Sequence, residues 1–240
     1  NSFNIMLLSP SGNQIFSHYY VYEFTIFIQS LTSDKLGNLI ATGISYVDRE
    51  DGSGDEEYIT IKFTPDGIED WTKEFTRVDW DDEVIDIGTD ANNNVYISGT
   101  TIPYDDETNV SEFLTIKYSP TGVMRWSKRY KYDNDWESYV YGFAVDSSGR
   151  ICVIGVSGEY FVTLCYSTGG TKLWIDTISY DDKDIEGNQV VFDKNGNTIV
   201  TGTYFFTIDM NRVFTDIFTR KYNAEGDTLF TRYYNGPGST

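Results

Sequence analysis

A turn glycine that returns at near-constant spacing constrains the fold more than any other feature of this sequence. It occurs five times, and a large aromatic residue follows it four positions later each time. Segments 58–75 and 113–130, YITIKFTPDGIEDWTKEF and FLTIKYSPTGVMRWSKRY, are near-copies in which apolar and polar residues alternate on both sides of the turn. That alternation predicts a β-hairpin. The glycine and its aromatic are Gly12 and Phe16, Gly67 and Trp71, Gly122 and Trp126, Gly170 and Trp174, and Gly226 and Phe230.

A second hairpin is expected between successive copies of the first. Its turn begins at an aspartate, and a further glycine comes nine positions after that aspartate. We interpret the aspartate as a side chain that caps the turn. A calcium loop of the EF-hand type would need oxygens at alternating positions and a distant glutamate. The four copies begin at Asp34, Asp90, Asp146 and Asp193, and their later glycines are Gly43, Gly99, Gly155 and Gly202.

Together the two hairpins make a unit of four strands, a to d, which repeats about every 50 residues and predicts a propeller blade. The expected fold class is all-β, a β-propeller of four-stranded antiparallel blades in a single domain, 1–240. Five blade positions are visible, and the first is a half blade made of strands c and d. The ring either closes around this half blade or belongs to a larger toroid. The half blade covers 1–20, and the blades cover about 24–75, 83–130, 139–178 and 187–234.

The repeat carries a resemblance to a known family. The pattern D-x-x-G-N-x-x-x-x-G, followed by Y-x-T-x-K-Y-x-x-x-G-x-x-x-W, resembles the bacterial β-propeller repeat called SBBP. The resemblance implies a bacterial protein that is extracellular, at the cell surface or periplasmic, without a catalytic role and in some cases part of a larger surface protein or assembly. The chain departs from the pattern at Cys165, where the family has lysine, and it begins at strand c.

Charge and composition exclude several classes of function. The formal net charge of −19 argues against binding to nucleic acid. No apolar run approaches the roughly 20 residues that a membrane-spanning helix needs. His18 is the only histidine, so a histidine-based metal cluster is excluded and a structural role is expected for this residue.

The net charge is confined to one predicted face. The b–c loops and the links from strand d to the next strand a hold 24 acidic and 5 basic residues, whereas the rest of the chain holds 13 of each. Carboxylates mixed with aromatic rings suit hydrogen bonding and stacking with a glycan, or contact with a basic protein. A solvated acidic surface is the alternative. The predicted ligand-binding residues are Tyr46, Trp80, Tyr104, Trp136, Tyr180 and Phe205.

Calcium is the expected ion if this face binds one, because it accepts six to eight oxygens from flexible loops. The acidic segments 48–57, 79–83 and 181–186 provide the candidate ligands. A solvated acidic loop remains the competing interpretation. The predicted calcium ligands are Asp48, Glu50, Asp51, Asp55, Asp79, Asp81, Asp82, Asp181, Asp182 and Asp184.

The channel offers an alternative, enzymatic function. Strand a is innermost, and the residue four positions before each turn aspartate is small or polar, as a channel lining requires: Ser30, Asp86, Gly142 and Gln189. Only Asp86 is acidic, and a glycosidase needs two carboxyl groups. We therefore expect a non-enzymatic binding or scaffolding module, with a glycoside-active enzyme that uses Asp86 as the alternative.

The two cysteines are expected to lie opposite each other. A two-residue turn at Gly158 and Glu159 pairs Ser157 with Tyr160, and the same register pairs Cys152 with Cys165. Directly opposed residues lie within disulfide range. A disulfide and two buried thiols are left as equal alternatives.

Overall fold

The computed structural model describes residues 2–22, 25–48, 54–76, 80–103, 110–132, 137–179, 184–209 and 212–235, and these ranges contain strands and no helix. Every strand pairing is antiparallel between neighbours in sequence. An amino-terminal hairpin joins β1 (Ser2–Leu8) to β2 (Gln14–Val21). Sheet 1 contains β3 (Thr25–Ser33), β4 (Leu39–Asp48), β5 (Gly54–Phe63) and β6 (Glu69–Phe75).

Three further four-stranded sheets follow in order. Sheet 2 contains β7 (Trp80–Thr89), β8 (Val95–Pro103), β9 (Glu112–Tyr118) and β10 (Met124–Tyr130). Sheet 3 contains β11 (Ser138–Val145), β12 (Ile151–Ser157), β13 (Tyr160–Tyr166) and β14 (Lys172–Ser179). Sheet 4 contains β15 (Asp184–Phe192), β16 (Thr198–Asp209), β17 (Arg212–Tyr222) and β18 (Thr228–Asn235).

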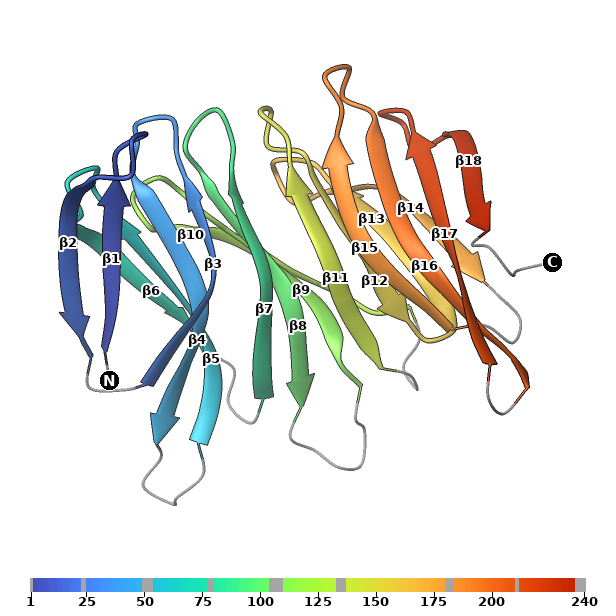
Figure 1. The fold of residues 1–240 in the computed structure, drawn as a ribbon, viewed down its shortest axis with the longest axis horizontal. Helices are drawn as coiled ribbons and strands as arrows, with labels where there is room; N and C mark the ends of the chain where they lie inside the picture. Colours follow the sequence, from blue (N-terminus) through green and yellow to red (C-terminus); the bar gives the residue numbers. More distant parts are fainter. Residues whose placement is uncertain are drawn as a thin grey trace.

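The four sheets are arranged as propeller blades. Their first strands, β3, β7, β11 and β15, contact one another in turn and lie side by side across Figure 1, with the outer strands behind them. The amino-terminal hairpin lies at one end of the long axis and β18 at the other. The all-β propeller architecture is confirmed, and closure of the ring stays a prediction. The hairpin expected for residues 1–20 is present from Ser2 to Val21, and it packs on sheet 1 through rings such as Tyr20 against Phe63.

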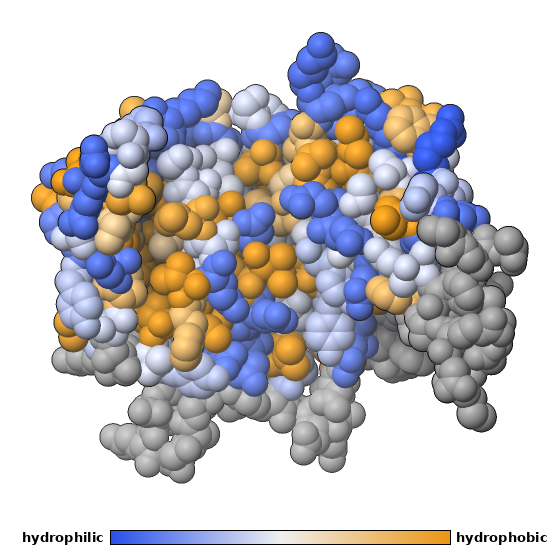
Figure 2. Space-filling view, in the orientation of Figure 1, coloured by the Kyte–Doolittle hydropathy of each residue, from blue (hydrophilic) through white to orange (hydrophobic). Residues whose placement is uncertain are grey.

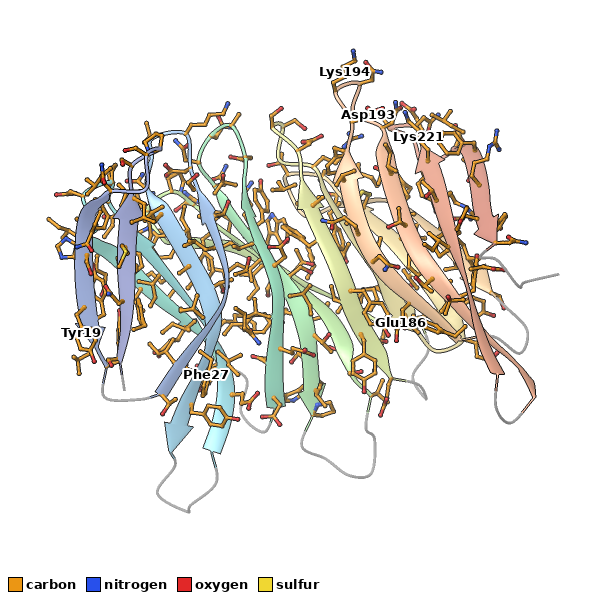
Figure 3. The ribbon with its side chains drawn as sticks, viewed as in Figure 1. Tyr19, Phe27, Glu186, Asp193, Lys194 and Lys221 are labelled. Carbon is orange, nitrogen blue, oxygen red and sulfur yellow. A yellow bond between two sulfur atoms is a disulfide. The ribbon has the colours of Figure 1, made fainter. Side chains whose placement is uncertain are left out.

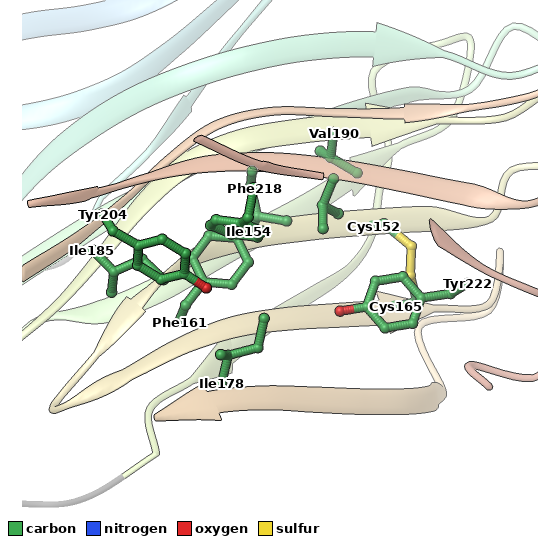
Figure 4. Close-up of a cluster of buried hydrophobic side chains, with 11 residues drawn as sticks. Cys152, Ile154, Phe161, Cys165, Ile178, Ile185, Val190, Tyr204, Phe218 and Tyr222 are labelled. Carbon is green, nitrogen blue, oxygen red and sulfur yellow. A yellow bond between two sulfur atoms is a disulfide. The ribbon is translucent and has the colours of Figure 1, made fainter. Parts of the chain in front are cut away.

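Apolar cores fill the spaces between neighbouring sheets. Between sheets 3 and 4, Phe161 and Phe218 meet edge to face with ring centroids 5.2 Å apart, and the tilted ring of Tyr204 lies beside Phe218 (Figure 4). The predicted cysteine register is confirmed. Cys152 and Cys165 are directly paired with Cα atoms 4.2 Å apart, and in the structure a buried disulfide joins them within this core.

The repeated tryptophans tie each sheet to the next. Trp71 donates its Nε1–H to the carbonyl of Pro120 in the outer turn of sheet 2, at 3.0 Å. Trp126 and Trp174 make the same bond to Thr168 and Ala224 of the following sheets. The turn glycines lie against these rings, where a side chain would collide. The repeated glycine and aromatic residue in the sequence therefore reflect one packing contact, in which the tryptophan of one sheet lies against the turn glycine of the next.

The repeated lysines are also structural. Lys62 is buried, donates to the Pro120 carbonyl and pairs with Asp34 at 3.3 Å. Lys117 donates to Thr168. The single histidine also contacts the turn of the neighbouring sheet, since His18 Nε2 lies 3.0 Å from the Asp66 carbonyl.

Each inner strand carries a β-bulge at the same place. On β7 the register shifts between Val84 and Asp86, so Ile85 is the extra residue. Equivalent shifts occur on β3, β11 and β15. Opposite each bulge is the later glycine of the repeat, and at Gly99 a Cβ would collide with the Glu83 carbonyl. The glycine is needed here because the inner backbone approaches it too closely for a side chain.

Replacing Gly99 by Ala is expected to displace the bulge of β7. The added Cβ meets backbone, which gives less readily than a side chain, so the free energy of unfolding should fall by about 1–3 kcal/mol. Thermal unfolding measures this. Gly169→Ala is the matched control, because its nearest atom outside the neighbouring residues is 3.8 Å from the new Cβ. Equal melting temperatures for the two variants would contradict the account of the bulge.

Candidate channel site

The bulges decide which side chains share a face of the inner strands. Glu83 is opposite Thr100 on β8, and Asp86 is opposite Ser98, two residues along. Residues two apart on a strand share a face, so Glu83 and Asp86 lie on the same face of β7. Without the bulge, two residues three apart would point to opposite faces. The same register gives two columns along the channel: Phe27, Glu83, Tyr139 and Glu186, and Ser30, Asp86, Gly142 and Gln189.

Three residues of these two columns are carboxylates: Glu83 and Asp86 on β7 and Glu186 on β15. Glu83 and Glu186 are exposed, and Asp86 is half-buried. Figure 3 shows Glu186 and Phe27 toward the loop end of their strands, and Asp193 and Lys194 at the turn end. The sequence prediction found only Asp86, because it placed Glu83 and Glu186 in links between blades. The recurring glycine opposite each bulge was the signal that could have identified them.

Asp86 is fixed by neighbours on two strands. Its Oδ1 accepts a hydrogen bond from Ser30 Oγ of β3 at 2.7 Å and one from the backbone N–H of Ile87 at 2.8 Å. Ser30 and Asp86 are the same position of successive repeats. Among the described residues, Oδ2 has no hydrogen-bond partner, and this oxygen is available to a ligand.

A cavity of about 760 Å³ opens beside Asp86. It is lined by the inner strands between Asp86 and the a–b turns, with Gln189 and Thr32 among its polar residues. Figure 2 shows apolar surface gathered over the middle of this face, interspersed with polar side chains. The cavity is thus lined by both polar and apolar side chains, and a cleft with convergent polar groups is the usual place to look for a small-molecule site.

Aromatic rings accompany the carboxylates at the loop end. Phe27 is 53% exposed, and its ring meets that of Tyr46 with centroids 6.0 Å apart. Burial, the hydrogen bond to Glu137 and nearby negative charges that include Glu83 raise the pKa of Tyr139 to about 12. Tyr139 is therefore a neutral hydrogen-bond donor at physiological pH.

The other carboxylates of the cavity are structural. Asp146 and Asp193 cap their turns as predicted, each accepting backbone N–H groups two and four residues later. Asp193 also pairs with Lys221 Nζ at 2.7 Å. The Lys221 ammonium, followed by the Asn197 amide, lowers the pKa of Asp193 well below its usual range. The carboxylates of Asp146 and Asp193 therefore stabilise their turns, and we do not assign them a role in catalysis.

Asp193→Asn is expected to lower the melting temperature most at neutral pH. A depressed folded-state pKa contributes stability above the unfolded pKa, about 4, and this contribution is lost as the pH falls below that value. The difference between the native chain and the variant should therefore be constant above about pH 5 and shrink steadily from about pH 4 downward, as far as the protein stays folded. Thermal melts across this range measure it. A difference independent of pH would contradict the role of the Lys221 pair.

The structure places part of the predicted loop face. Tyr46 is 39% exposed and donates its hydroxyl to Glu56, and this bond together with the charge of Asp81 raises the pKa of Tyr46. Asp82 is buried near Tyr58 instead of facing solvent. Trp80 and Phe205 are half-buried on β7 and β16. Tyr104, Trp136, Tyr180, Glu50, Asp51, Asp79, Asp181 and Asp182, and the side chains of Asp48, Asp55 and Asp184, lie outside the described residues.

No group of three or more potential metal ligands occurs among the described side chains. Calcium binding by the loop face accordingly stays a prediction. In the same residues there is no helix long and apolar enough to cross a membrane.

The fold and the channel define a β-propeller with carboxylates on its inner strands, and solved structures share that architecture. The α-L-arabinanase of Penicillium chrysogenum, in complex with arabinobiose, matches with a TM-score of 0.56 and 11% identity, over 98% of this chain and 71% of its own. A protein of unknown function from Dyadobacter fermentans matches with a TM-score of 0.54 and 10% identity, over 97% and 71%. The Synechocystis apocarotenoid oxygenase matches with a TM-score of 0.52 and 9% identity, over 98% and 58%.

No family model matches the chain, and no curated protein does either. The resemblance to the SBBP repeat therefore stays a prediction. At identities near 10% the structural likeness establishes the fold.

The comparisons correct the preferred function. A non-enzymatic binding or scaffolding module was expected, with enzymatic activity as the less favoured alternative. The named arabinanase and oxygenase that share the fold are enzymes, and this finding overturns the expectation of a non-catalytic module. The preference was wrong because it counted a single channel carboxylate, whereas the bulges bring Glu83 onto the same face as Asp86.

Proposed function

We propose that the protein is a glycoside-active enzyme whose reaction takes place in the channel at Glu83 and Asp86. The observation that carries this proposal is the shared face of these two residues on β7. Their partners on β8 are two residues apart, so their Cα atoms are separated by roughly 7 Å along the strand. Glycosidases use a pair of carboxyl groups that flank the scissile bond.

We propose that hydrolysis proceeds with inversion of configuration. Inverting enzymes hold their carboxyl groups about 6.5–9.5 Å apart, which leaves room for a water molecule. One carboxyl group protonates the leaving oxygen, and the other removes a proton from the attacking water. Asp86, held by Ser30, is the better-fixed member of the pair. Phe27 on β3 supplies a stacking surface, and Tyr139 on β11, whose hydroxyl donates to Glu137, supplies an oxygen that can accept a hydrogen bond.

The test is hydrolysis of a panel of neutral oligosaccharides, beginning with α-L-arabino-oligosaccharides because the arabinanase neighbour was solved with arabinobiose. Proton NMR of the fresh product reports the anomer released. Product of inverted configuration, lost in the Asp86→Asn variant, is expected. Retained configuration would exclude the inverting mechanism, and the absence of turnover across neutral pentose and hexose oligomers would exclude the function.

We also propose that the protein works in an oxidising compartment, which is extracellular, at the cell surface or periplasmic. Its support is the Cys152–Cys165 disulfide, since disulfides persist mainly outside the reducing cytosol. The SBBP resemblance points to the same compartments.

Calcium is proposed as a ligand of the acidic loops. Millimolar calcium is expected to raise the melting temperature by binding the native state, beyond the effect of sodium at equal ionic strength. Neutralising Asp79 and Asp81 together should raise stability without calcium and remove its effect at this segment, whereas Asp82 is left unchanged because it is buried. Equal stabilisation by the two salts would leave only charge screening and exclude a calcium site.

A further inference from the structure

The cavity beside Asp86 lies on one side of the proposed catalytic pair. Its lining runs from Asp86 and Gln189 on the inner strands to the a–b turns at Ser147 and Gly196, and it does not include Glu83. A substrate whose scissile bond is flanked by Glu83 and Asp86 therefore places the sugar on the turn side of that bond in the cavity.

One layer of the inner strands supplies the polar side chains at the inner end of this cavity. The β-bulges put Ser30, Asp86, Gly142 and Gln189 at the same position of successive sheets. Ser30 is hydrogen-bonded to Asp86, and Gly142 carries no side chain. Gln189 of β15 is exposed, and in the described part of the chain its amide has no hydrogen-bond partner. Within this layer the Gln189 amide is thus available to a ligand, together with Asp86 Oδ2.

The residue before Gln189 is an amide with a different role. Asn188 is the extra residue of the β15 bulge, and its Oδ1 accepts a hydrogen bond from Thr203 Oγ1 of β16 at 3.0 Å. Asn188 does not line the cavity, whereas Gln189 does. The two neighbouring amides therefore separate a contact within sheet 4 from a group that faces the cavity.

Apolar side chains complete the wall around these polar groups. Ala144 and Val145 of β11 are half-buried and line the cavity between β7 and β15. Val191 of β15, which is 44% exposed, lines it on the same strand as Gln189. An apolar wall with a few polar groups that fix orientation suits a sugar ring, which has apolar C–H groups and hydroxyls around its edge.

Given the channel reaction proposed above, we infer that Gln189 is a specificity-determining residue that binds two adjacent hydroxyl groups of the sugar in the cavity. An amide carries a donor and an acceptor side by side, so its N–H can donate to one hydroxyl oxygen while its carbonyl accepts from the next hydroxyl. The substrate class is therefore a glycan with an unsubstituted vicinal diol on the sugar at the turn side of the cleaved bond.

Gln189→Ala is the variant that tests this role, and Asn188→Ala is its matched control, because it removes the neighbouring amide outside the cavity. On the oligosaccharide that the native chain hydrolyses fastest, Gln189→Ala should raise KM about tenfold, the scale of one or two lost hydrogen bonds. It should change kcat by less than about twofold, since the contact is made equally in the bound substrate and in the transition state. Asn188→Ala should leave KM and kcat unchanged, and melting curves establish that both variants are folded.

Monodeoxy analogues of the same oligosaccharide locate the hydroxyls. The native chain should cleave the analogues that lack either hydroxyl of the pair with kcat/KM about tenfold lower. Gln189→Ala should not distinguish these analogues from the parent compound, because the side chain that recognises the hydroxyls is absent. A purely structural role of Gln189 would leave the preference for the parent compound intact in the variant.

An unchanged KM for Gln189→Ala, or the same preference against the deoxy analogues in the native chain and the variant, would overturn this role while hydrolysis itself stood. If the native chain cleaved no oligosaccharide of the panel, the proposed function would fail separately. Saturation-transfer NMR of the same oligosaccharides, with the native chain and with Gln189→Ala, then decides the role of Gln189 without turnover. Weaker transfer to the variant supports sugar binding by Gln189, and equal transfer or none to both proteins would overturn it.

Discussion

Asp86→Asn is expected to lower kcat on the substrate found in the oligosaccharide panel by a factor of about 10²–10⁴, the usual contribution of a general acid or base. The amide has nearly the same shape and can still accept the hydrogen bond from Ser30 Oγ, so the fold should be retained. Glu83→Gln should cause a loss in the same range, because both members of the pair act in the same bond cleavage. Initial rates at saturating substrate measure both effects.

Two controls separate chemistry from stability. Glu225→Gln makes the same carboxylate-to-amide change in the outer turn of sheet 4, and it should leave kcat unchanged. Ser30→Ala keeps Asp86 but removes one of its two hydrogen-bond donors, so a smaller loss is expected. If Asp86→Asn and Glu225→Gln had equal rates, Asp86 would have no role in the reaction.

Replacing both Cys152 and Cys165 by Ala is expected to remove about 3 kcal/mol from the free energy of unfolding. The disulfide joins residues 13 apart, and the loop-entropy account gives roughly this value for a loop of that size. For a chain of this length the melting temperature should fall by roughly 6–12 °C. Calorimetry of the oxidised protein and of the double variant measures the difference.

Reductant provides the control for this effect. Because both cysteines are fully buried in the core between sheets 3 and 4, reduction should require unfolding first. Protein unfolded and refolded in reductant should melt near the double variant, and the double variant should not respond to reductant. If the native chain melted at the same temperature with and without reductant after refolding, the two residues would act as thiols, the alternative that the register left open.

The contrast between Cys152 and Glu83 shows how far a sequence pattern can be taken. The cysteine register follows from a two-residue turn and the alternation of a strand, and both are local properties of one hairpin. Glu83 was assigned to a link between blades, whereas β7 already begins at Trp80. The bulge at Ile85 then shifts the alternation of β7 by one residue, which puts Glu83 and Asp86 on the same face.

The environments of the acidic residues follow only in part from the sequence. The sequence shows which segments carry the acidic residues, and their confinement to one loop face stays a prediction. The sequence did not predict that Asp82 is buried while Asp81 lies near Tyr46, because neighbouring residues on a strand face opposite ways and their environments come from other sheets.

The sequence by itself determined the hairpins, their turns, the four-strand unit and the half blade at the amino terminus. Each of these depends on hydrogen bonds and turn conformations within some 20 residues, and the repeat displays them several times. Only the tertiary structure decided which carboxylates share the channel and why Leu31 is exposed while Ile87 is buried. Those outcomes depend on how inner strands about 50 residues apart pack together, and on whether a preceding sheet is present to cover them.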